Sequence, residues 1–285
     1  MITAEGLFYR YPRAADYALN GVDFSVAPGE VFGLLGPSGA GKTTTQSILI
    51  GLLKNYQGTV SVGGRDLRRA GPDYYERIGV AFEFPNLYTK FTALENLTFF
   101  QSLYRNETED PHELLALVGL EHATLTRVSE FSQGMKMRLR LCRAFINRPE
   151  VVFLDEPTAS LDPVNARRVR NLIDARRDTG TTAVLSTHDM VTADAVCDRV
   201  AFIVDGLIRA VDSPRRLKMQ GSSKRVRVEC SGDEGKTAVH EFDLERLEAN
   251  EEFARLLRQR RVETIHTVEP TLEDVFVKVT GRALQ

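Results

Sequence analysis

One glycine-rich stretch constrains this chain more than any other: residues 36–44 read Gly-Pro-Ser-Gly-Ala-Gly-Lys-Thr-Thr. The stretch matches the phosphate-binding spacing G-x-x-x-x-G-K-[ST], known as the P-loop. Residues 30–35, before it, are typical of a buried strand, and residues 43–53, after it, are typical of a helix. Because the full motif has this strand–loop–helix context, we predict a nucleoside-triphosphate site rather than a glycine-rich turn that binds nothing.

Each part of the loop has a physical role in holding phosphate. Glycines lack the β-carbons that would keep a phosphate away from the backbone, so successive amide N–H groups can converge on one anion. The N-terminus of the following helix adds partial positive charge. Lys42 is expected against the β- and γ-phosphates of ATP, and the Thr43 hydroxyl is expected to bind Mg²⁺. The other predicted nucleotide contacts in the loop are Gly36, Ser38, Gly39, Gly41 and Thr44.

Two adjacent acids follow a second apolar run, at residues 151–154. A buried parallel strand delivers its last residues to the sheet edge where α/β proteins bind ligands. Neighbouring strand residues point to opposite sides, so we expect Asp155 to hold Mg²⁺ through water and Glu156 to orient or deprotonate the attacking water. The competing interpretation, N-cap chemistry for a following helix, is disfavoured by Pro157 and by the P-loop.

A histidine follows a third apolar run, at residues 182–186. A single histidine is usually structural, but His188 would reach the same edge of the sheet as the two acids. In a nucleotide-binding fold that position favours contact with phosphate. We therefore predict His188 as a phosphate sensor.

Composition excludes several classes of protein. The 285 residues are 42% hydrophobic and 27% charged, which is typical of a globular chain with one large and one small domain. The net charge of −2 gives no electrostatic reason to expect nucleic acid or an anionic membrane surface as a direct partner. No run approaches the roughly 18 apolar residues of a membrane span, and no signal peptide is recognisable, so we expect a cytosolic protein. The three cysteines are expected to be reduced core thiols without a structural metal: Cys142, Cys197 and Cys230.

The order of apolar patterns indicates an α/β fold. Short apolar runs between turn residues predict antiparallel strands within residues 1–30, a hairpin-like stretch at 58–64 and a strand at 78–82. Helical periodicity at 94–104 and 113–120 predicts an inserted helical subdomain over about residues 85–135, and a long helix then runs through residue 147. The basic residues of that long helix are expected on a solvated face rather than against nucleic acid: Lys136, Arg138, Arg140 and Arg143.

We therefore predict a P-loop NTPase core with an antiparallel β subdomain and an inserted helical subdomain over residues 1–218. A small α+β accessory domain is predicted over residues 219–285, with strands at 225–230, 237–243 and 262–266, a helix at 244–259 and a last helix at 271–279. Two interpretations of this accessory domain stay open, a functional appendage and a stabilising tail.

Residues 131–135, Phe-Ser-Gln-Gly-Met, narrow the assignment to one family. They resemble the signature of the nucleotide-binding subunits of ATP-binding-cassette (ABC) transporters, and the similarity covers residues 1 to about 215. Gln133 and Met135 depart from the commonest signature but leave Ser132 and Gly134 in place. Residues 270–276 also resemble the closing segment of ATPases that pair with drug- and antibiotic-export permeases.

The resemblance implies roles for three further residues. Asp162 belongs to a stretch like the loop that crosses the dimer interface, and His188 is similar to the switch histidine. Tyr11 is similar to the aromatic that stacks on adenine. From spacing alone, Tyr11 is interpreted equally well as an aromatic in the core of a sheet.

The resemblance also implies an assembly. Two copies of the chain would enclose two ATP molecules, each held by one P-loop and by Ser132 and Gly134 of the other copy. Hydrolysis is expected to drive a separate membrane permease, gripped near residues 83–98, that exports drugs, antibiotics or peptides. The protein would then be peripheral on the inner face of the cell membrane.

Glu83 is the largest departure from the family pattern, because the family usually has glutamine there. The variant resembles ATPases of lantibiotic-immunity exporters. A carboxylate at this position is expected to bind Mg²⁺ more tightly than an amide. In the alternative interpretation, Glu83 points at the permease and touches neither metal nor phosphate.

Two other functions compete with transport. A soluble ABC ATPase acting on ribosomes or DNA would resemble families with two fused cassettes or long heptad insertions, and this chain has neither. A nucleotide-binding module that does not hydrolyse ATP has no physical need for Glu156 and His188, so the sequence disfavours it.

Overall fold

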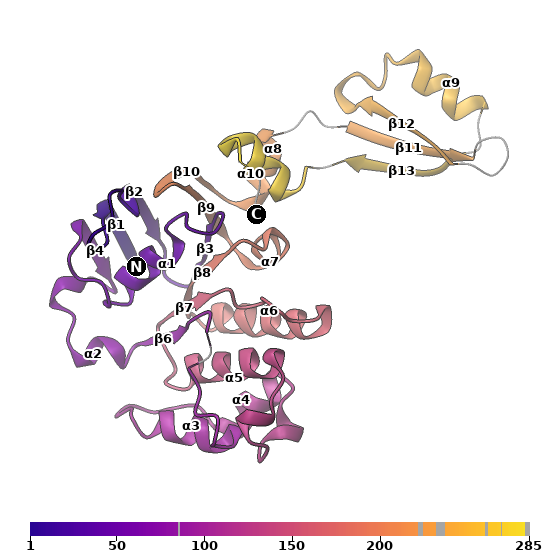
Figure 1. Ribbon diagram of the computed structural model, residues 1–285. Coiled ribbons are helices and arrows are strands. Elements are labelled where there is room, and N and C mark those ends of the chain that lie inside the picture. The colour runs from indigo at the N-terminus through magenta and orange to yellow at the C-terminus, as the bar shows by residue number, and fades with distance from the viewer. Residues whose placement is uncertain (85, 222–224, 232–236, 260–261, 269, 283–285) are drawn as a thin grey trace.

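The computed structural model describes residues 1–84, 86–221, 225–231, 237–259, 262–268 and 270–282. A six-stranded sheet in the order β10-β9-β3-β8-β7-β6 forms the centre of the molecule (Figure 1). In this sheet β3, β6, β7, β8 and β9 are parallel, and β10 is antiparallel to β9. Its strands are β3 (Val31–Leu35), β6 (Ile78–Ala81), β7 (Val151–Asp155), β8 (Thr182–Thr187), β9 (Arg199–Val204) and β10 (Leu207–Asp212).

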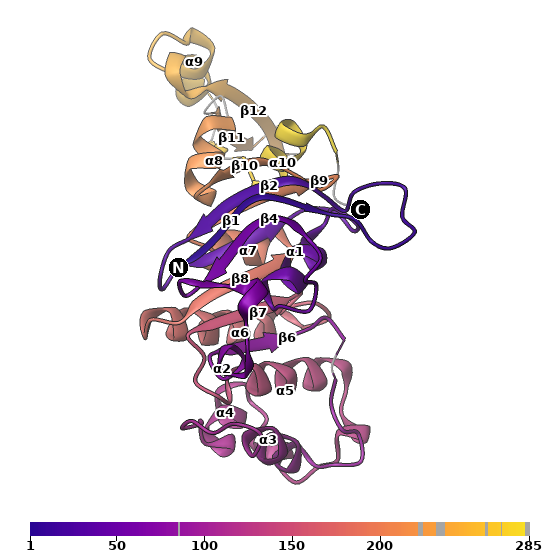
Figure 2. The ribbon, with the colours of Figure 1, turned by 90° about the vertical axis from the view of Figure 1, so that its left-hand side faces the viewer.

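A four-stranded antiparallel sheet lies over one face of the central sheet (Figure 2). It has the order β2-β1-β4-β5 and pairs β1 (Ile2–Tyr9) with β2 (Leu19–Val26) and with β4 (Gln57–Val62). The hairpin from β4 to β5 (Arg65–Asp66) confirms the turn predicted at residues 58–64. Helix α1 (Lys42–Leu49) shares one hydrophobic core with both sheets. It is shorter than the helix predicted at 43–53, because Ile50 caps it and Gly51 has a left-handed backbone (φ +86°).

The opposite face of the central sheet packs against helices. A second hydrophobic core joins that face to α5 (Gln133–Phe145), α6 (Pro163–Asp178) and α7 (Met190–Val196). Two more helices, α3 (Ala93–Gln101) and α4 (Pro111–Leu117), pack on α5 and bear out the helical subdomain expected from periodicity. This subdomain lies at one end of the molecule and the accessory sheet at the other (Figures 1 and 2). The short helix α2 (Pro72–Tyr75) precedes β6.

The prediction of a solvated basic face on α5 is wrong: two of its four residues are buried, and Lys136 and Arg143 are half-buried. Arg138 and Arg140 are both buried, and Arg140 is 0% exposed. The guanidinium of Arg138 donates to the main-chain carbonyls of Val118 and Gly119 at 2.7 and 3.1 Å. Carbonyl oxygens supplied by other elements thus compensate for burying these cations, and sequence spacing on one helix does not reveal such partners.

The accessory domain forms a three-stranded antiparallel sheet with a small core of its own. Its strands β11 (Arg225–Ser231), β12 (Thr237–Asp243) and β13 (Val262–Val268) confirm the three predicted strands. The predicted helix at 244–259 is wrong in its first half. A 3₁₀ turn at Leu244–Arg246 follows β12, and α9 (Glu251–Gln259) begins only where the Asn250 side chain accepts the Phe253 N–H.

The last helix, α10 (Leu272–Thr280), packs on the first domain and not on the accessory sheet. Its buried side chains belong to the hydrophobic core of the first domain, where α10 contacts α7, α8 (Pro214–Gly221) and β9. Phe276 is fully buried and meets the Phe202 ring edge to face, with centroids 5.1 Å apart. The prediction that residues 219–285 form one domain therefore misplaces this helix, because its apolar face completes the core of the first.

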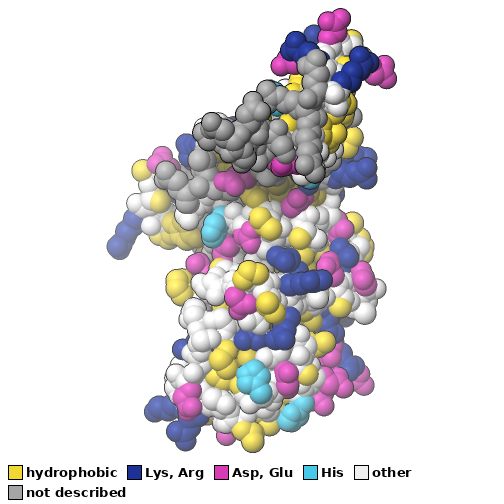
Figure 3. Space-filling view, turned by 90° about the vertical axis from the view of Figure 1, so that its right-hand side faces the viewer, with side chains coloured by type: hydrophobic (Ala, Val, Ile, Leu, Met, Phe, Trp, Pro, Cys, Tyr) yellow, Lys and Arg dark blue, Asp and Glu magenta, His cyan; other side chains and the backbone are white. Residues whose placement is uncertain are grey.

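Three further observations bear on the predicted class of protein. Cys142, Cys197 and Cys230 are buried free thiols, as expected. Within the residues that the structure describes, no helix combines the length and apolar content that a membrane crossing requires. On the face shown in Figure 3, acidic and basic side chains are interspersed.

Candidate functional site

The P-loop joins β3 to α1 and buries its lysine. Lys42 is only 8% exposed, and its Nζ donates to the carbonyls of Gly36 and Pro37 at 2.6 and 3.0 Å. Burial lowers the pKa of Lys42, and the charges of Glu156, Asp155 and Glu83 act in the opposite direction. A β-carbon at position 36 would approach the Ile203 carbonyl oxygen to 2.1 Å, so only glycine fits where this loop leaves the sheet.

The helix behind the loop is tied to the strands that carry the acids. The side-chain amide of Gln46, which is buried in α1, donates to the carbonyls of Leu154 and Val184 at 3.1 and 3.2 Å. These bonds fix the middle of α1 relative to β7 and β8. Ser38 and Gly39 on the loop and Thr43 in the first turn of α1 are exposed.

Tyr11 lies beside the P-loop helix and outside the core. Its ring is 43% exposed and stands edge-on to Tyr9, with centroids 4.9 Å apart. Its hydroxyl shares a hydrogen bond of 3.1 Å with Thr44 Oγ1. The interpretation of Tyr11 as a core aromatic is therefore wrong, and adenine stacking stays a prediction.

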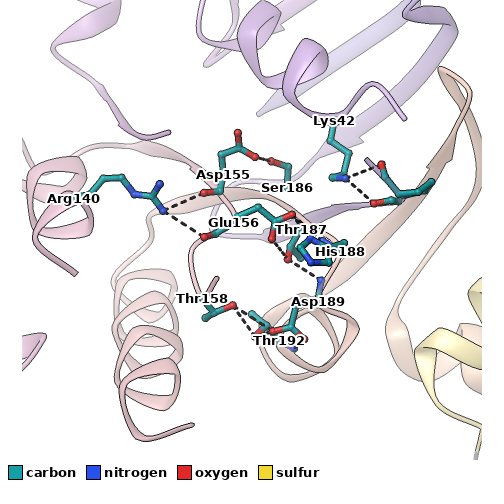
Figure 4. Close-up of polar contacts among 12 residues, drawn as sticks. Lys42, Arg140, Asp155, Glu156, Thr158, Ser186, Thr187, His188, Asp189 and Thr192 are labelled. Carbon is teal, nitrogen blue, oxygen red and sulfur yellow. Dashed lines mark hydrogen bonds and ion pairs between the residues drawn. The ribbon is translucent and has the colours of Figure 1, made fainter. Parts of the chain in front are cut away.

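The two acids at the end of β7 face different partners. Asp155 is the last residue of the strand, and its carboxylate accepts a hydrogen bond from the Ser186 hydroxyl on β8 (Figure 4). Burial raises the pKa of Asp155, although the bond from Ser186 opposes that rise. Glu156 instead contacts Thr187, the last residue of β8, and His188, which follows that strand. The two acids thus have different surroundings, and their separate roles stay a prediction.

Both carboxylate oxygens of Glu156 make hydrogen bonds, with Thr187 and His188 as the partners. Thr187 Oγ1 donates to Oε2 at 2.8 Å, and the His188 N–H donates to Oε1 at 3.1 Å. The imidazole Nδ1 of His188 lies 2.7 Å from the same Oε1 (Figure 4). The backbone of Glu156 has a left-handed φ of +47°, which costs a residue with a β-carbon about 1–3 kcal/mol. These hydrogen bonds help to maintain the strained backbone of Glu156.

Glu83 follows β6 in an exposed segment within electrostatic reach of Lys42. Three carboxylates, those of Glu83, Asp155 and Glu156, therefore act on one ammonium group. These carboxylates and the Thr43 hydroxyl are hard oxygen donors of the kind that Mg²⁺ prefers. Among the described residues, no three acidic, histidine or cysteine side chains are gathered into a metal-binding cluster.

The residues expected to act on the other copy's nucleotide lie apart from this centre. Ser132 caps α5 by accepting the Met135 N–H at 3.3 Å, and Asp162 caps α6 by accepting the N–H groups of Val164 and Asn165. A β-carbon on Gly134 would meet Leu161 at 3.3 Å, so the start of α5 packs against the loop before α6. Within the described residues, no hydrogen bond joins Ser132, Gly134 or Asp162 to the P-loop.

Three residues of the site were missed in the sequence. Ser186 and Thr187 are polar residues at buried positions at the end of β8, and that contrast was a readable signal. Arg140 reaches the site from α5 and donates to the main chain of Asp155 and Glu156. The sequence spacing gives no indication of these contacts, because the partners of Arg140 are main-chain carbonyls on another element.

A glycine-rich loop between β3 and α1, acids at the end of β7 and a histidine after β8 define a P-loop nucleotide-binding protein. Comparison with known proteins gives the family. Residues 19–159 match the model described as ABC transporter, and residues 224–269 match the fluoroquinolone efflux ABC transporter C-terminal domain. The chain belongs to the ABC transporter family as an ATP-binding subunit and ATPase.

Individual relatives support this assignment. The fluoroquinolones export ATP-binding protein of Mycobacterium tuberculosis (strain ATCC 25618 / H37Rv) is 54% identical over 284 residues, covering 100% of this chain and 94% of that protein. The linearmycin resistance ATP-binding protein of Bacillus subtilis (strain 168) is 29% identical over 312 residues, covering 100% of both chains. A solved cassette dimer in a post-hydrolysis state with ADP and Pi aligns with a TM-score of 0.68 and 26% identity, covering 75% of this chain and 98% of that one. The predicted fold class and family resemblance are confirmed.

Proposed function

We propose that this chain is the ATP-hydrolysing subunit of an exporter of drugs or antibiotics and that it acts on a separate membrane permease. One observation carries the proposal: the 54% identity to a fluoroquinolone-export subunit runs through 100% of the chain, accessory domain included. The match of residues 224–269 to the C-terminal domain of fluoroquinolone efflux transporters supports the same substrate class. The permease would hold the subunit at the inner face of the membrane.

In this function the P-loop holds the triphosphate and Glu156 activates water. Lys42 would exchange its bonds to the Gly36 and Pro37 carbonyls for the β- and γ-phosphates. Glu156 would take the proton of the attacking water, with its carboxylate oriented by Thr187 and His188. Nδ1 of His188 is hydrogen-bonded to the Glu156 carboxylate. The other ring nitrogen, Nε2, would therefore contact the γ-phosphate, since His188 is exposed.

A magnesium ion bound by Thr43, Asp155 and Glu83 would neutralise phosphate charge during the reaction. Asp155 lies within electrostatic reach of the P-loop lysine, so its carboxylate would be near the phosphates. Glu83 would add a negative charge that needs the cation for compensation.

The complete unit is proposed to be a dimer of this chain. The N-terminus of α5, at Ser132 and Gly134, offers free N–H groups to an anion but makes no described contact with its own P-loop. A second copy, turned head to tail, would place that N-terminus on the γ-phosphate. ATP would then bridge the two halves, and hydrolysis would favour their separation.

Drug accumulation in cells tests the proposal. The chain and the membrane protein encoded beside it are expressed in a strain that lacks its own efflux pumps, and intracellular fluoroquinolone is measured. We expect lower accumulation with the wild-type chain and none of this effect with Glu156→Gln. Equal accumulation with both chains, when both are bound to the membrane protein, would favour a soluble ATPase that acts on another partner.

A further inference from the structure

Arg140 is a fully buried cation that the proposed chemistry does not use. It is 0% exposed, on the middle of α5, and it is the largest of the fully buried side chains described. Burying a charge is costly unless other groups compensate for it. A buried arginine at this position therefore needs an explanation in the site that it faces.

The guanidinium bonds to the main chain of both acids. Nη2 donates to the carbonyl oxygen of Asp155 at 3.2 Å and to that of Glu156 at 3.4 Å (Figure 4). Glu156 is the residue with the left-handed backbone, and its own N–H donates to the Ser186 carbonyl at 2.8 Å. The peptide between Asp155 and Glu156 is therefore bonded at its carbonyl by Arg140 of α5 and at its N–H by Ser186 of β8.

The rest of the guanidinium is unpaired: Nε and Nη1 of Arg140 are buried and have no hydrogen-bond partner among the described residues. The carboxylates of Asp155, Glu83 and Glu156 all favour its charged form, while Arg143 opposes it. Burial lowers the pKa of Arg140 to about 10, so the side chain remains a cation at neutral pH. Figure 4 shows Arg140 and Lys42 on opposite sides of Asp155 and Glu156.

The placement on α5 also connects Arg140 to the proposed composite site. Ser132 caps the same helix eight residues earlier, about 12 Å along the axis at 1.5 Å per residue. A helix of this length moves as a rigid element. A shift of its N-terminus would therefore be transmitted to the carbonyls of Asp155 and Glu156.

We propose that Arg140 is a positioning residue for Glu156: its guanidinium fixes the strained Asp155–Glu156 main chain from α5. This inference rests on the proposed role of Glu156 as the base. Removing Arg140 would leave ATP binding at the P-loop intact but would let the Glu156 carboxylate drift from its productive position. A misplacement of about 1 Å in an active site can cost about 10²-fold in rate.

Steady-state ATPase kinetics on the full-length chain test the proposal. For Arg140→Met, which keeps the volume but removes the charge, we expect kcat per folded molecule to fall about 10²-fold and KM for ATP to change less than about twofold. Arg140→Lys, which keeps the charge but not the planar fork, should fall in between. Leu141→Ala is the matched control, because Leu141 is fully buried on the same helix and lies in the apolar core.

The outcomes separate positioning from simple stabilisation. Leu141→Ala should lower the melting temperature and keep kcat per folded molecule. A wild-type kcat in Arg140→Met would overturn the proposal, and so would an equal loss of kcat in Leu141→Ala.

Two further results keep the test decisive. If Arg140→Met does not fold, Arg140→Lys and Arg140→Gln supply the same comparison, and wild-type kcat in both would overturn the proposal. Glu156→Gln is assayed in parallel. A near wild-type rate in Glu156→Gln would contradict the proposed function itself, whereas an inactive Glu156→Gln beside a fully active Arg140→Met would contradict only this inference.

Discussion

Glu156 concentrates the strain and the hydrogen bonds of the site in one residue. Its left-handed backbone is stabilised by the Ser186 carbonyl, by Thr187 and His188 at its carboxylate, and by Arg140 at its own carbonyl. A residue so constrained loses little entropy when it acts on a water molecule. The arrangement favours chemistry over packing as the reason for its conformation.

The first prediction removes the charge of this residue. Glu156→Gln should lower ATP turnover about 10²–10⁴-fold, the usual range for general base catalysis, because an amide cannot accept the proton. ATP binding should survive, and the ATP-bound dimer should accumulate in size-exclusion chromatography. Lys42→Ala is the control that should lose the nucleotide. Turnover near the wild-type rate in Glu156→Gln would exclude Glu156 as the base.

The second prediction concerns the carboxylate of Glu83. Like charges about 4 Å apart repel by up to about 4 kcal/mol at an effective dielectric constant of 20, unless a cation stands between them. Glu83 should therefore make ATP binding more dependent on Mg²⁺ than a glutamine would. We expect a weaker Mg²⁺ requirement for Glu83→Gln when ATP affinity is titrated against the metal. Identical Mg²⁺ dependence in the two chains would remove Glu83 from the metal site and favour contact with the permease.

At the scale of elements, the last helix, α10, packs into the core of the nucleotide-binding domain. The accessory sheet has a separate core, yet the helix after it returns to the core beneath β9 and α8. A Thr271–Asp274 capping box fixes the start of α10. The accessory domain is thereby held at both of its ends by the nucleotide-binding domain.

The third prediction tests this anchoring. Phe276→Ala should destabilise the nucleotide-binding domain by about 3–5 kcal/mol, the usual cost of truncating a buried phenylalanine. Val279→Ala on the same helix is the control: Val279 is 44% exposed, and the change should stay within about 0.5 kcal/mol. Urea unfolding followed by circular dichroism measures both. Equal stability of the two variants would show that α10 does not support the core.

At the scale of the whole molecule, the P-loop and the residues expected to act on a second nucleotide form separate groups. Asp155 ends β7 and Glu156 follows it, whereas Ser132 caps α5 and Asp162 caps α6, and no described hydrogen bond joins these caps to the P-loop. In the proposed head-to-tail dimer, each chain would therefore contribute two half-sites. Only a second copy would bring the halves together around ATP.

The fourth prediction follows from the half-sites. Lys42→Ala and Ser132→Arg should each abolish ATPase activity alone, because each damages both sites of a homodimer. Mixing the two chains should restore activity, since each heterodimer contains one site with neither substitution. Affinity tags on the two chains confirm heterodimer formation. Heterodimers without ATPase activity would contradict the head-to-tail arrangement.

The sequence by itself determined the parts of the protein whose physics is local. The P-loop, the buried strands before the acids and the signature before α5 depend on short spacings, and each was recognised with its neighbours. The α/β class followed from the order of apolar runs. The boundaries were less certain, because caps such as Asn250 compete with helix periodicity over a few residues.

Only the tertiary structure decided which charged groups are buried and which elements share a core. Arg138 and Arg140 looked like a solvated face, but carbonyls on other elements compensate for burying them. In the same way, the sequence did not show which core the apolar face of α10 would join. In the structure that face completes the core of the first domain. Burial and electrostatic balance are properties of surfaces assembled from distant segments, and local spacing does not contain them.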